Sequence, residues 1–219
     1  MKRLLESEAQ QPLAQQWRVP STLSVTAFLT FVRDRDEFLR RYVRRVPSPP
    51  SPAAQLGTEL HRRIEVHARE AGIVGALPDD VPEPYDLGPS ERSGGAEPVS
   101  AETLWQNFKR SRFAGMMPRM TEQPFTLYIG EGFSVQGRID AVFEREDGVW
   151  EIVDYKTGKS EPDPLQLAIY ARAVEEIWGK DTISYWLNLR TGSEEAAPPV
   201  DGLNDILMRT VAELKDMAI

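Results

Sequence analysis

Two aspartates and a lysine lie in two neighbouring strand-like segments, "GRIDAVFE" and "WEIVDYK". Asp140 is in the middle of its segment, and Asp154 and Lys156 are at the end of the other. Because side chains alternate along a strand, Asp154 and Lys156 project from one face. The intervening turn signal "EDG" predicts a β-hairpin, which would bring Asp140 close to Asp154 across the ladder.

Carboxylates that converge in a half-buried place repel each other and lose the water that stabilises their charges. A hard divalent cation between them removes this conflict. Magnesium favours oxygen ligands and keeps several waters, which suits two carboxylates and a phosphate substrate. The pattern predicts metal-assisted hydrolysis of a phosphodiester, in which Lys156 touches the phosphate or orients or deprotonates the nucleophile.

Each of these residues also has a purely structural interpretation. Asp154 and Lys156 can form an ordinary ion pair at the end of a strand, with "TGK" as a polar turn after it. Asp140, taken alone, can be a polar residue of the sheet. Taken one at a time, such residues are more often structural than catalytic.

The composition narrows the class of protein. The 219 residues are 41% hydrophobic, enough for one buried domain or for a core domain with a helical elaboration. There is no cysteine, which excludes disulfides, thiolate zinc sites and iron–sulfur clusters, so any metal must be held by oxygen and histidine. No apolar run of about eighteen residues and no leader pattern is present, and we expect a soluble, cytoplasmic protein.

The charge is unevenly distributed along the chain. The net charge is −8, yet residues 1–69 carry 12 Lys and Arg against 7 Asp and Glu, while residues 70–219 carry 14 against 27. This asymmetry fits a basic N-terminal face on an acidic body. A solvated surface with uneven charge explains it equally well.

The elements around the candidate residues begin with a helical region. We expect a linker or lone helix over residues 1–20, and then a single domain over residues 21–219. Its part from 21–120 is predicted to be mainly helical, with two short helices that break near residues 33–36. Three further segments complete it: a proline-stiffened connector over residues 47–55, a helix over residues 57–70, and a long loop over residues 71–99 before a helix capped by Ser100.

The part from 121–190 is predicted to be a β-rich catalytic core. It contains strands over residues 124–129, 133–145, 149–155 and 182–189, with a helix over residues 164–178 before the last of them. A C-terminal helix is predicted after this part, over residues 203–218. The order β-β-β-α-β, with helices before and after, predicts a mixed sheet between helices.

Four motifs, in order, resemble the PD-(D/E)XK nucleases and specifically their RecB-like branch. They are "GTELHRRIE", "GRID", "DYKTG" and "QLAIYA". The segment "LSVTAFLTFVRDRDEF" is also similar to the start of nuclease domains at the C-terminus of actinobacterial UvrD/RecB-type helicases. The resemblance covers about residues 21–190. It implies a restriction-endonuclease-like α/β fold, with a mixed central sheet flanked by helices and an N-terminal helical elaboration.

The resemblance also implies roles for individual residues. His61, Asp140 and Asp154 would ligate the metal together with the backbone carbonyl of Tyr155, and Lys156 would be the catalytic lysine. Outside this resemblance, a lone histidine such as His61, beside a buried helical stripe, is more often a packing residue.

Further residues near the implied site are Gln166, Tyr170 and Glu122. Gln166 and Tyr170, four apart on one helix face, match the family's helical motif, which positions DNA or the lysine. Without the resemblance they read as a polar residue and a half-buried tyrosine. Glu122, placed just ahead of the first strand of the core, is a candidate additional ligand or a partner of a ligand.

The implied function is that of a Mg- or Mn-dependent deoxyribonuclease, an exonuclease rather than an endonuclease, acting in DNA repair or recombination. No G-x-x-x-x-G-K-[ST] phosphate loop occurs in the chain, so a helicase motor would lie elsewhere in the polypeptide or in a partner subunit. Two alternatives stay open. One is a catalytically silent DNA-binding or scaffolding module of the same fold, and the other is an enzyme that acts on another phosphoester.

Arginines in the N-terminal part provide a candidate DNA-binding face. We expect them to contact phosphates without reading the base sequence. The candidates are Arg40, Arg41, Arg44, Arg45, Arg62 and Arg63.

Overall fold

The computed structural model describes residues 19–44, 52–70, 99–159 and 161–217. The expected long loop over residues 71–99 and the expected linker over residues 1–20 lie almost entirely outside the described residues, as does Arg45. No helix among the described segments is long and apolar enough to cross a membrane.

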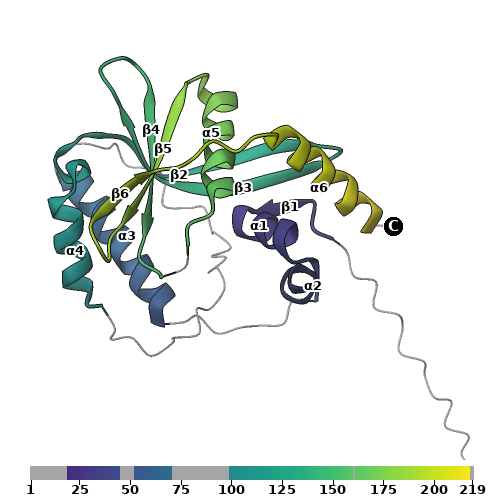
Figure 1. The fold of residues 1–219 in the computed structure, drawn as a ribbon, viewed down its shortest axis with the longest axis horizontal. Coiled ribbons are helices and arrows are strands. Elements are labelled where there is room, and N and C mark those ends of the chain that lie inside the picture. Colours follow the sequence, from purple (N-terminus) through teal and green to yellow (C-terminus); the bar gives the residue numbers. More distant parts are fainter. Residues whose placement is uncertain (1–18, 45–51, 71–98, 160, 218–219) are drawn as a thin grey trace, which may run out of the picture.

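The central sheet is mixed, as the sequence predicts, and it has six strands (Figure 1). The order is β1-β3-β4-β5-β6, and β2 also pairs with β3. β1 and β3 are parallel, β3 is antiparallel to β2 and β4, and β4 and β5 are parallel. The strands are β1 Thr22–Ser24, β2 Pro118–Gly130, β3 Phe133–Glu144, β4 Trp150–Lys156, β5 Thr182–Asn188 and β6 Ser193–Ala196.

Helices cover both faces of the sheet. Figure 1 shows α3 and α4 on one side, and α1, α5 and α6 on the other. The helical elements are α1 Val25–Arg33, α2 Arg35–Phe38, the π-helical turn η1 Leu39–Val43, α3 Pro52–Glu70, α4 Ala101–Arg110, the 3-10 turn η2 Arg112–Gly115, α5 Pro164–Trp178 and α6 Leu203–Met217.

Each face has its own hydrophobic core. The core beneath α1, α5 and α6 includes Phe28, Ile139 and Ile152. The core beneath α3 and α4 includes Leu104 and Val153. β4 is buried on both faces, with every residue from Trp150 to Tyr155 buried, so it is the central strand that carries the candidate residues into the middle of the molecule.

Local sequence signals explain the position of α5. Asp163 caps its N-terminus by accepting a hydrogen bond from the backbone N–H of Leu165, and Pro164 occupies the first helical position, where no N–H is needed. Gly179 ends the helix with a φ of 63°, a conformation that costs glycine little. The first two turns of α5 thereby hold Gln166 and Tyr170 beside the end of β4.

Two elements begin five or more residues earlier than the sequence predicts, and two short strands are not predicted. α3 begins at Pro52, inside the segment expected to be a non-helical connector, because proline is compatible with the first turn of a helix. β2 begins at Pro118 rather than at residue 124, so Glu122 lies within this strand. β1 and β6, which are three and four residues long, are too short to show a periodic pattern.

The side chains of β3 do not alternate strictly between the two faces of the sheet, as a regular strand predicts. Ile139 belongs to the core beneath α5, whereas Ala141 belongs to the core beneath α3, although strict alternation assigns both to one face. The break falls at Asp140. Opposite it in β2, Glu122 has a φ of 47°, a left-handed conformation that is unusual for a non-glycine residue. The sheet is therefore locally distorted where Asp140 of β3 lies opposite Glu122 of β2.

Candidate active site

The candidate site lies where β3 and β4 separate. Their ladder runs from Glu144 opposite Trp150 to Ala141 opposite Val153, and the next position along it holds Asp140 and Asp154. Nearer its N-terminus, β3 pairs with β1 instead. At the separation, the backbone N–H of Tyr155 donates a hydrogen bond of 2.8 Å to Asp140 Oδ2. A side-chain carboxylate thus replaces a main-chain partner at the end of the ladder.

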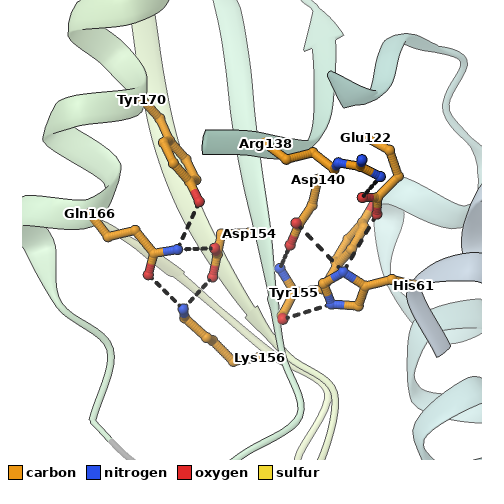
Figure 2. A network of polar contacts seen from close by, with 9 residues as sticks. All are labelled: His61, Glu122, Arg138, Asp140, Asp154, Tyr155, Lys156, Gln166 and Tyr170. Atoms are coloured by element: carbon orange, nitrogen blue, oxygen red, sulfur yellow. Dashed lines mark hydrogen bonds and ion pairs between the residues drawn. The ribbon is translucent and has the colours of Figure 1, made fainter. Parts of the chain in front are cut away.

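His61 reaches this point from α3. Its Nε2 lies 3.3 Å from the carbonyl oxygen of Tyr155, and its Nδ1 lies 3.6 Å from Asp140 Oδ1 and 3.5 Å from Glu122 Oε1 (Figure 2). One nitrogen or oxygen atom from each of His61, Glu122 and Asp140 lies within 4.8 Å of the others, a cluster that could hold a metal ion. We call these three residues the His61 cluster.

The apolar stripe of α3 orients His61. Leu60, Ile64 and Ala68 are buried in this helix, and Leu60 and Ile64 pack into the core beneath it. His61, next to this stripe, is therefore turned toward the sheet rather than away from it. His67 lies elsewhere on the helix, where its ring contacts Trp105 of α4 edge to face and its Nε2 lies 3.3 Å from the carbonyl oxygen of Ala114.

A second group of residues surrounds Lys156. Its Nζ lies 2.8 Å from Asp154 Oδ2 and donates a 2.8 Å hydrogen bond to Gln166 Oε1. Gln166 Nε2 in turn donates to Asp154 Oδ1 and to the Tyr170 hydroxyl, at 2.9 Å in each case. Figure 2 shows Gln166 reaching Asp154 and Lys156 from α5, with the Tyr170 hydroxyl next to the Gln166 amide. We call these four residues the Lys156 cluster.

Protonation in the His61 cluster reflects its excess of carboxylates. Burial opposes a charge on His61, but Asp140 and Glu122 outweigh burial and raise its pKa to about 10. Burial raises the pKa of Asp140 to about 7, with help from Asp154 and Glu122 and against the opposing charge of His61. The carboxylates of the site therefore favour positive charge nearby, which a protonated His61 would supply.

Lys156 is a cation in this environment. Burial opposes its charge, but the neighbouring Asp154 carboxylate outweighs this and raises the pKa of Lys156 above its usual value. Burial also raises the pKa of the Tyr155 and Tyr170 hydroxyls well above 10, so both are neutral phenols. Lys156 can thus donate hydrogen bonds to an anionic oxygen and stabilise its charge.

The donor atoms of the site fit a hard divalent cation. Carboxylate oxygens, a backbone carbonyl and an imidazole nitrogen are the ligand types that magnesium and manganese accept. Asp154 Oδ2 is buried, and its charged neighbour among the described residues is the Lys156 ammonium. A cation at the site would give this oxygen a ligand bond.

The structure brings together the seven residues that the resemblance places at the site and Glu122, the additional ligand candidate named from the sequence. Asp154 is separate from the His61 cluster and contacts Lys156 instead. Glu122, expected just ahead of a strand, lies inside β2 with a left-handed backbone and 3.6 Å from Arg138 Nη1. Neither its backbone conformation nor its approach to His61 leaves a signal in sequence periodicity.

The described arginines of the expected DNA-binding face mostly contact nearby carboxylates. Arg40 and Arg41 pair with Glu37, and Arg62 pairs with Glu59.

Arg63 points toward α4 rather than toward His61. Its guanidinium lies 4.3 Å from the centre of the Trp105 ring, and it also pairs with Glu102. This cation–π contact gives Arg63 a packing role between α3 and α4.

Known proteins resemble most of the chain. A family model described as the PD-(D/E)XK nuclease superfamily matches residues 22–216. Over 57 residues, 24% of this chain, the sequence is 46% identical to an ATP-dependent helicase/nuclease subunit of Moorella thermoacetica (strain ATCC 39073 / JCM 9320). Over 81 residues, 33% of this chain, it is 37% identical to the equivalently named protein of Clostridium novyi (strain NT). These matches span only 4% and 6% of the two relatives.

A solved structure shares the fold. A crystal structure from Eubacterium rectale, described as "Putative exonuclease", superposes with a TM-score of 0.54. The superposition covers 99% of this chain and 85% of that protein, at 14% sequence identity. At this identity the similarity concerns the fold alone.

Proposed function

Because the chain belongs to the PD-(D/E)XK nuclease superfamily, we propose that it is a metal-dependent deoxyribonuclease that hydrolyses phosphodiester bonds. One observation carries the proposal: the His61 cluster and the Lys156 cluster adjoin each other at the separation of β3 and β4, where Asp140 accepts the Tyr155 N–H. Anionic ligands thereby stand next to a cationic lysine, the combination that phosphate hydrolysis requires.

The proposed metal ligands are His61, Asp140, Asp154 and the backbone carbonyl of Tyr155. Glu122 is a further candidate, because its carboxylate lies within the same cluster. The oxygen-rich ligand set favours Mg or Mn. When bound, such a cation supplies positive charge that activates a water and neutralises the phosphate.

We assign the stabilisation of the phosphate charge to Lys156 and the positioning of Lys156 to Gln166. Lys156, held as a cation, donates to the phosphate oxygens or orients the attacking water. Its raised pKa makes it a donor rather than a base. Gln166 and Tyr170 do not need to touch the substrate, because Gln166 bridges Lys156 and Asp154 and keeps their relative position.

The proposed biological setting is a helicase–nuclease that acts in DNA repair or recombination. The two relatives, both named as subunits of an ATP-dependent helicase/nuclease, support a link to a helicase motor, in the same polypeptide or in a partner subunit. Arg40, Arg41, Arg44 and Arg62 remain proposed phosphate contacts, because surface ion pairs such as that of Arg62 with Glu59 are weak and exchange readily with DNA.

The direct test is DNA cleavage by this chain with Mg or Mn. Linear and circular substrates, each single- and double-stranded, are incubated with metal and with a chelator. We expect metal-dependent degradation of linear DNA and no cutting of circles. Cutting of circles would replace the exonuclease assignment by an endonuclease, and a chain that binds metal and DNA without cutting would support the silent-module alternative.

A further inference from the structure

The turn that follows β5 is held rigidly next to the catalytic lysine. Leu189 N–H donates to the carbonyl of Lys156 at 2.9 Å, which continues the ladder between β4 and β5 by one residue. Asn188 Oδ1 accepts hydrogen bonds from the backbone N–H groups of Arg190 and Thr191, at 2.9 and 3.3 Å. The turn closes at Gly192, whose φ of 77° suits glycine.

A residue from α4 fixes the same turn from the other side. Asn107 Nδ2 donates to the carbonyl oxygens of Leu189 and Arg190, at 2.9 and 3.1 Å. The backbone of Arg190 is therefore held through both its N–H and its carbonyl. These contacts fix the backbone from which the Arg190 side chain extends.

The Arg190 side chain lies over the end of β4. Its Nη1 donates a long hydrogen bond, 3.4 Å, to the carbonyl oxygen of Thr157, the residue directly after Lys156. A guanidinium has five N–H donors, and this contact uses one of them. Within the part of the chain that the structure describes, no carboxylate lies within 4.0 Å of Arg190, unlike most of the arginines there.

α3 reaches the same rim. A Cβ at Gly57 would lie only 3.1 Å from Thr157 Oγ1, so the absence of a side chain at Gly57 lets the helix approach the end of β4. The His61 helix, the end of β4 and the Arg190 turn thus meet at the carboxyl ends of two parallel strands, the edge at which α/β proteins commonly bind ligands.

We propose that Arg190 is a phosphate-binding residue that holds the DNA backbone next to the scissile phosphodiester. This inference rests on the proposed nuclease function and adds a residue to it. A half-buried arginine that has free donors, a fixed backbone and no acidic partner among the described residues suits bidentate contact with a phosphate. The contact would position the strand without reading its bases.

The test compares four proteins: wild type, Arg190→Ala, Arg190→Lys and Arg190→Gln. Glutamine keeps a donor for the Thr157 carbonyl but has no charge, and lysine keeps the charge. Binding of a labelled single-stranded oligonucleotide is measured by fluorescence anisotropy without metal, across a range of salt concentrations, and steady-state cleavage is measured with metal. Thermal melting checks the folding of each variant. Arg209→Ala is the matched control, because Arg209 is exposed on α6 and also has no carboxylate within 4.0 Å among the described residues.

We expect Arg190→Ala and Arg190→Gln to weaken binding about tenfold, the usual loss for one hydrogen-bonded charged contact. The slope of log affinity against log salt should fall by about 0.7, the value for one phosphate contact on a single strand. KM for DNA should rise with little change in kcat. Arg190→Lys should retain the slope, and Arg209→Ala should match wild type.

A glutamine variant that binds and cuts like wild type would overturn the inference, since it would show that Arg190 only satisfies the Thr157 carbonyl. In that case the nuclease function would stand, because wild type would still cut. Absence of both DNA binding and cleavage by wild type would overturn the inference and the proposed function together.

Discussion

Asp140 accepts the backbone N–H of Tyr155 across the point where β3 and β4 separate, at 2.8 Å. This hydrogen bond joins Asp140 of the His61 cluster to β4, the strand that carries Asp154 and Lys156. The Tyr155 carbonyl of β4 lies near His61. Asp154 and Lys156, on either side of Tyr155 in β4, project from the opposite face of this strand and contact each other. One aspartate is thus both a proposed ligand and a structural link.

Substitution of Asp140 should separate these two roles. Asp140→Asn keeps an acceptor for Tyr155 and removes a charge that burial disfavours, whereas Asp140→Ala leaves the N–H unsatisfied. We expect the alanine variant to be less stable than the asparagine variant by about 1–3 kcal/mol, measured by urea unfolding without metal. Both should lose cleavage. Equal stabilities would show that the Tyr155 bond contributes nothing.

Metal binding should release protons. A metal ligand must be unprotonated, but the pKa of His61 is raised to about 10 and that of Asp140 to about 7. Apparent Mn affinity should therefore rise with pH, by roughly two powers of ten per pH unit below the Asp140 pKa and roughly one between the two pKa values. Calorimetric titration in buffers of different ionisation enthalpy counts the protons. A pH-independent affinity would contradict the assigned ligands.

The left-handed backbone of Glu122 should lower the free energy of unfolding of the protein. A left-handed backbone costs a non-glycine residue roughly 1–2 kcal/mol, so Glu122→Gly should raise the free energy of unfolding and weaken metal binding.

Glu131→Gly is the matched control for this variant. Glu131 has a φ of 51° in the exposed turn between β2 and β3, so its replacement should stabilise the protein and leave metal binding unchanged. Unchanged metal affinity in Glu122→Gly would remove Glu122 from the proposed ligands.

Gln166 should act by positioning Lys156. Gln166→Ala removes the bridge between Lys156 and Asp154, and we expect kcat to fall about 10- to 100-fold with KM for DNA unchanged. Tyr170→Phe removes only a hydroxyl that accepts from Gln166, so its effect should be smaller. Steady-state kinetics decide between these outcomes, and a change confined to KM would indicate that Gln166 contacts DNA instead.

The sequence predicts the elements of the sheet but not their local distortion. Alternation in β4 correctly places Asp154 and Lys156 together, since this strand is regular. The same rule is wrong for β3 beyond Ile139, because the interruption at Asp140 lies opposite the left-handed backbone of Glu122 in β2, which periodicity does not reveal.

Long-range contacts explain the other differences. His61 is recognised from its motif, but its distance from Glu122 depends on how α3 packs on the sheet. Arg190 has no motif at all. Its fixed position comes from Asn107, more than eighty residues earlier, and from the ladder that joins β4 to β5.

The most direct test of the central claim is the single-turnover rate of linear DNA cleavage by wild type and Lys156→Ala at saturating metal. Lys180→Ala is the control, because Lys180 is a partly exposed lysine that pairs with Glu144 away from the site. We predict that Lys156→Ala lowers the rate about 10²- to 10³-fold, as loss of a charge-stabilising donor does, and still binds the metal. The control should cut like wild type. Equal rates for wild type and Lys156→Ala would show that the chemistry does not occur at this site.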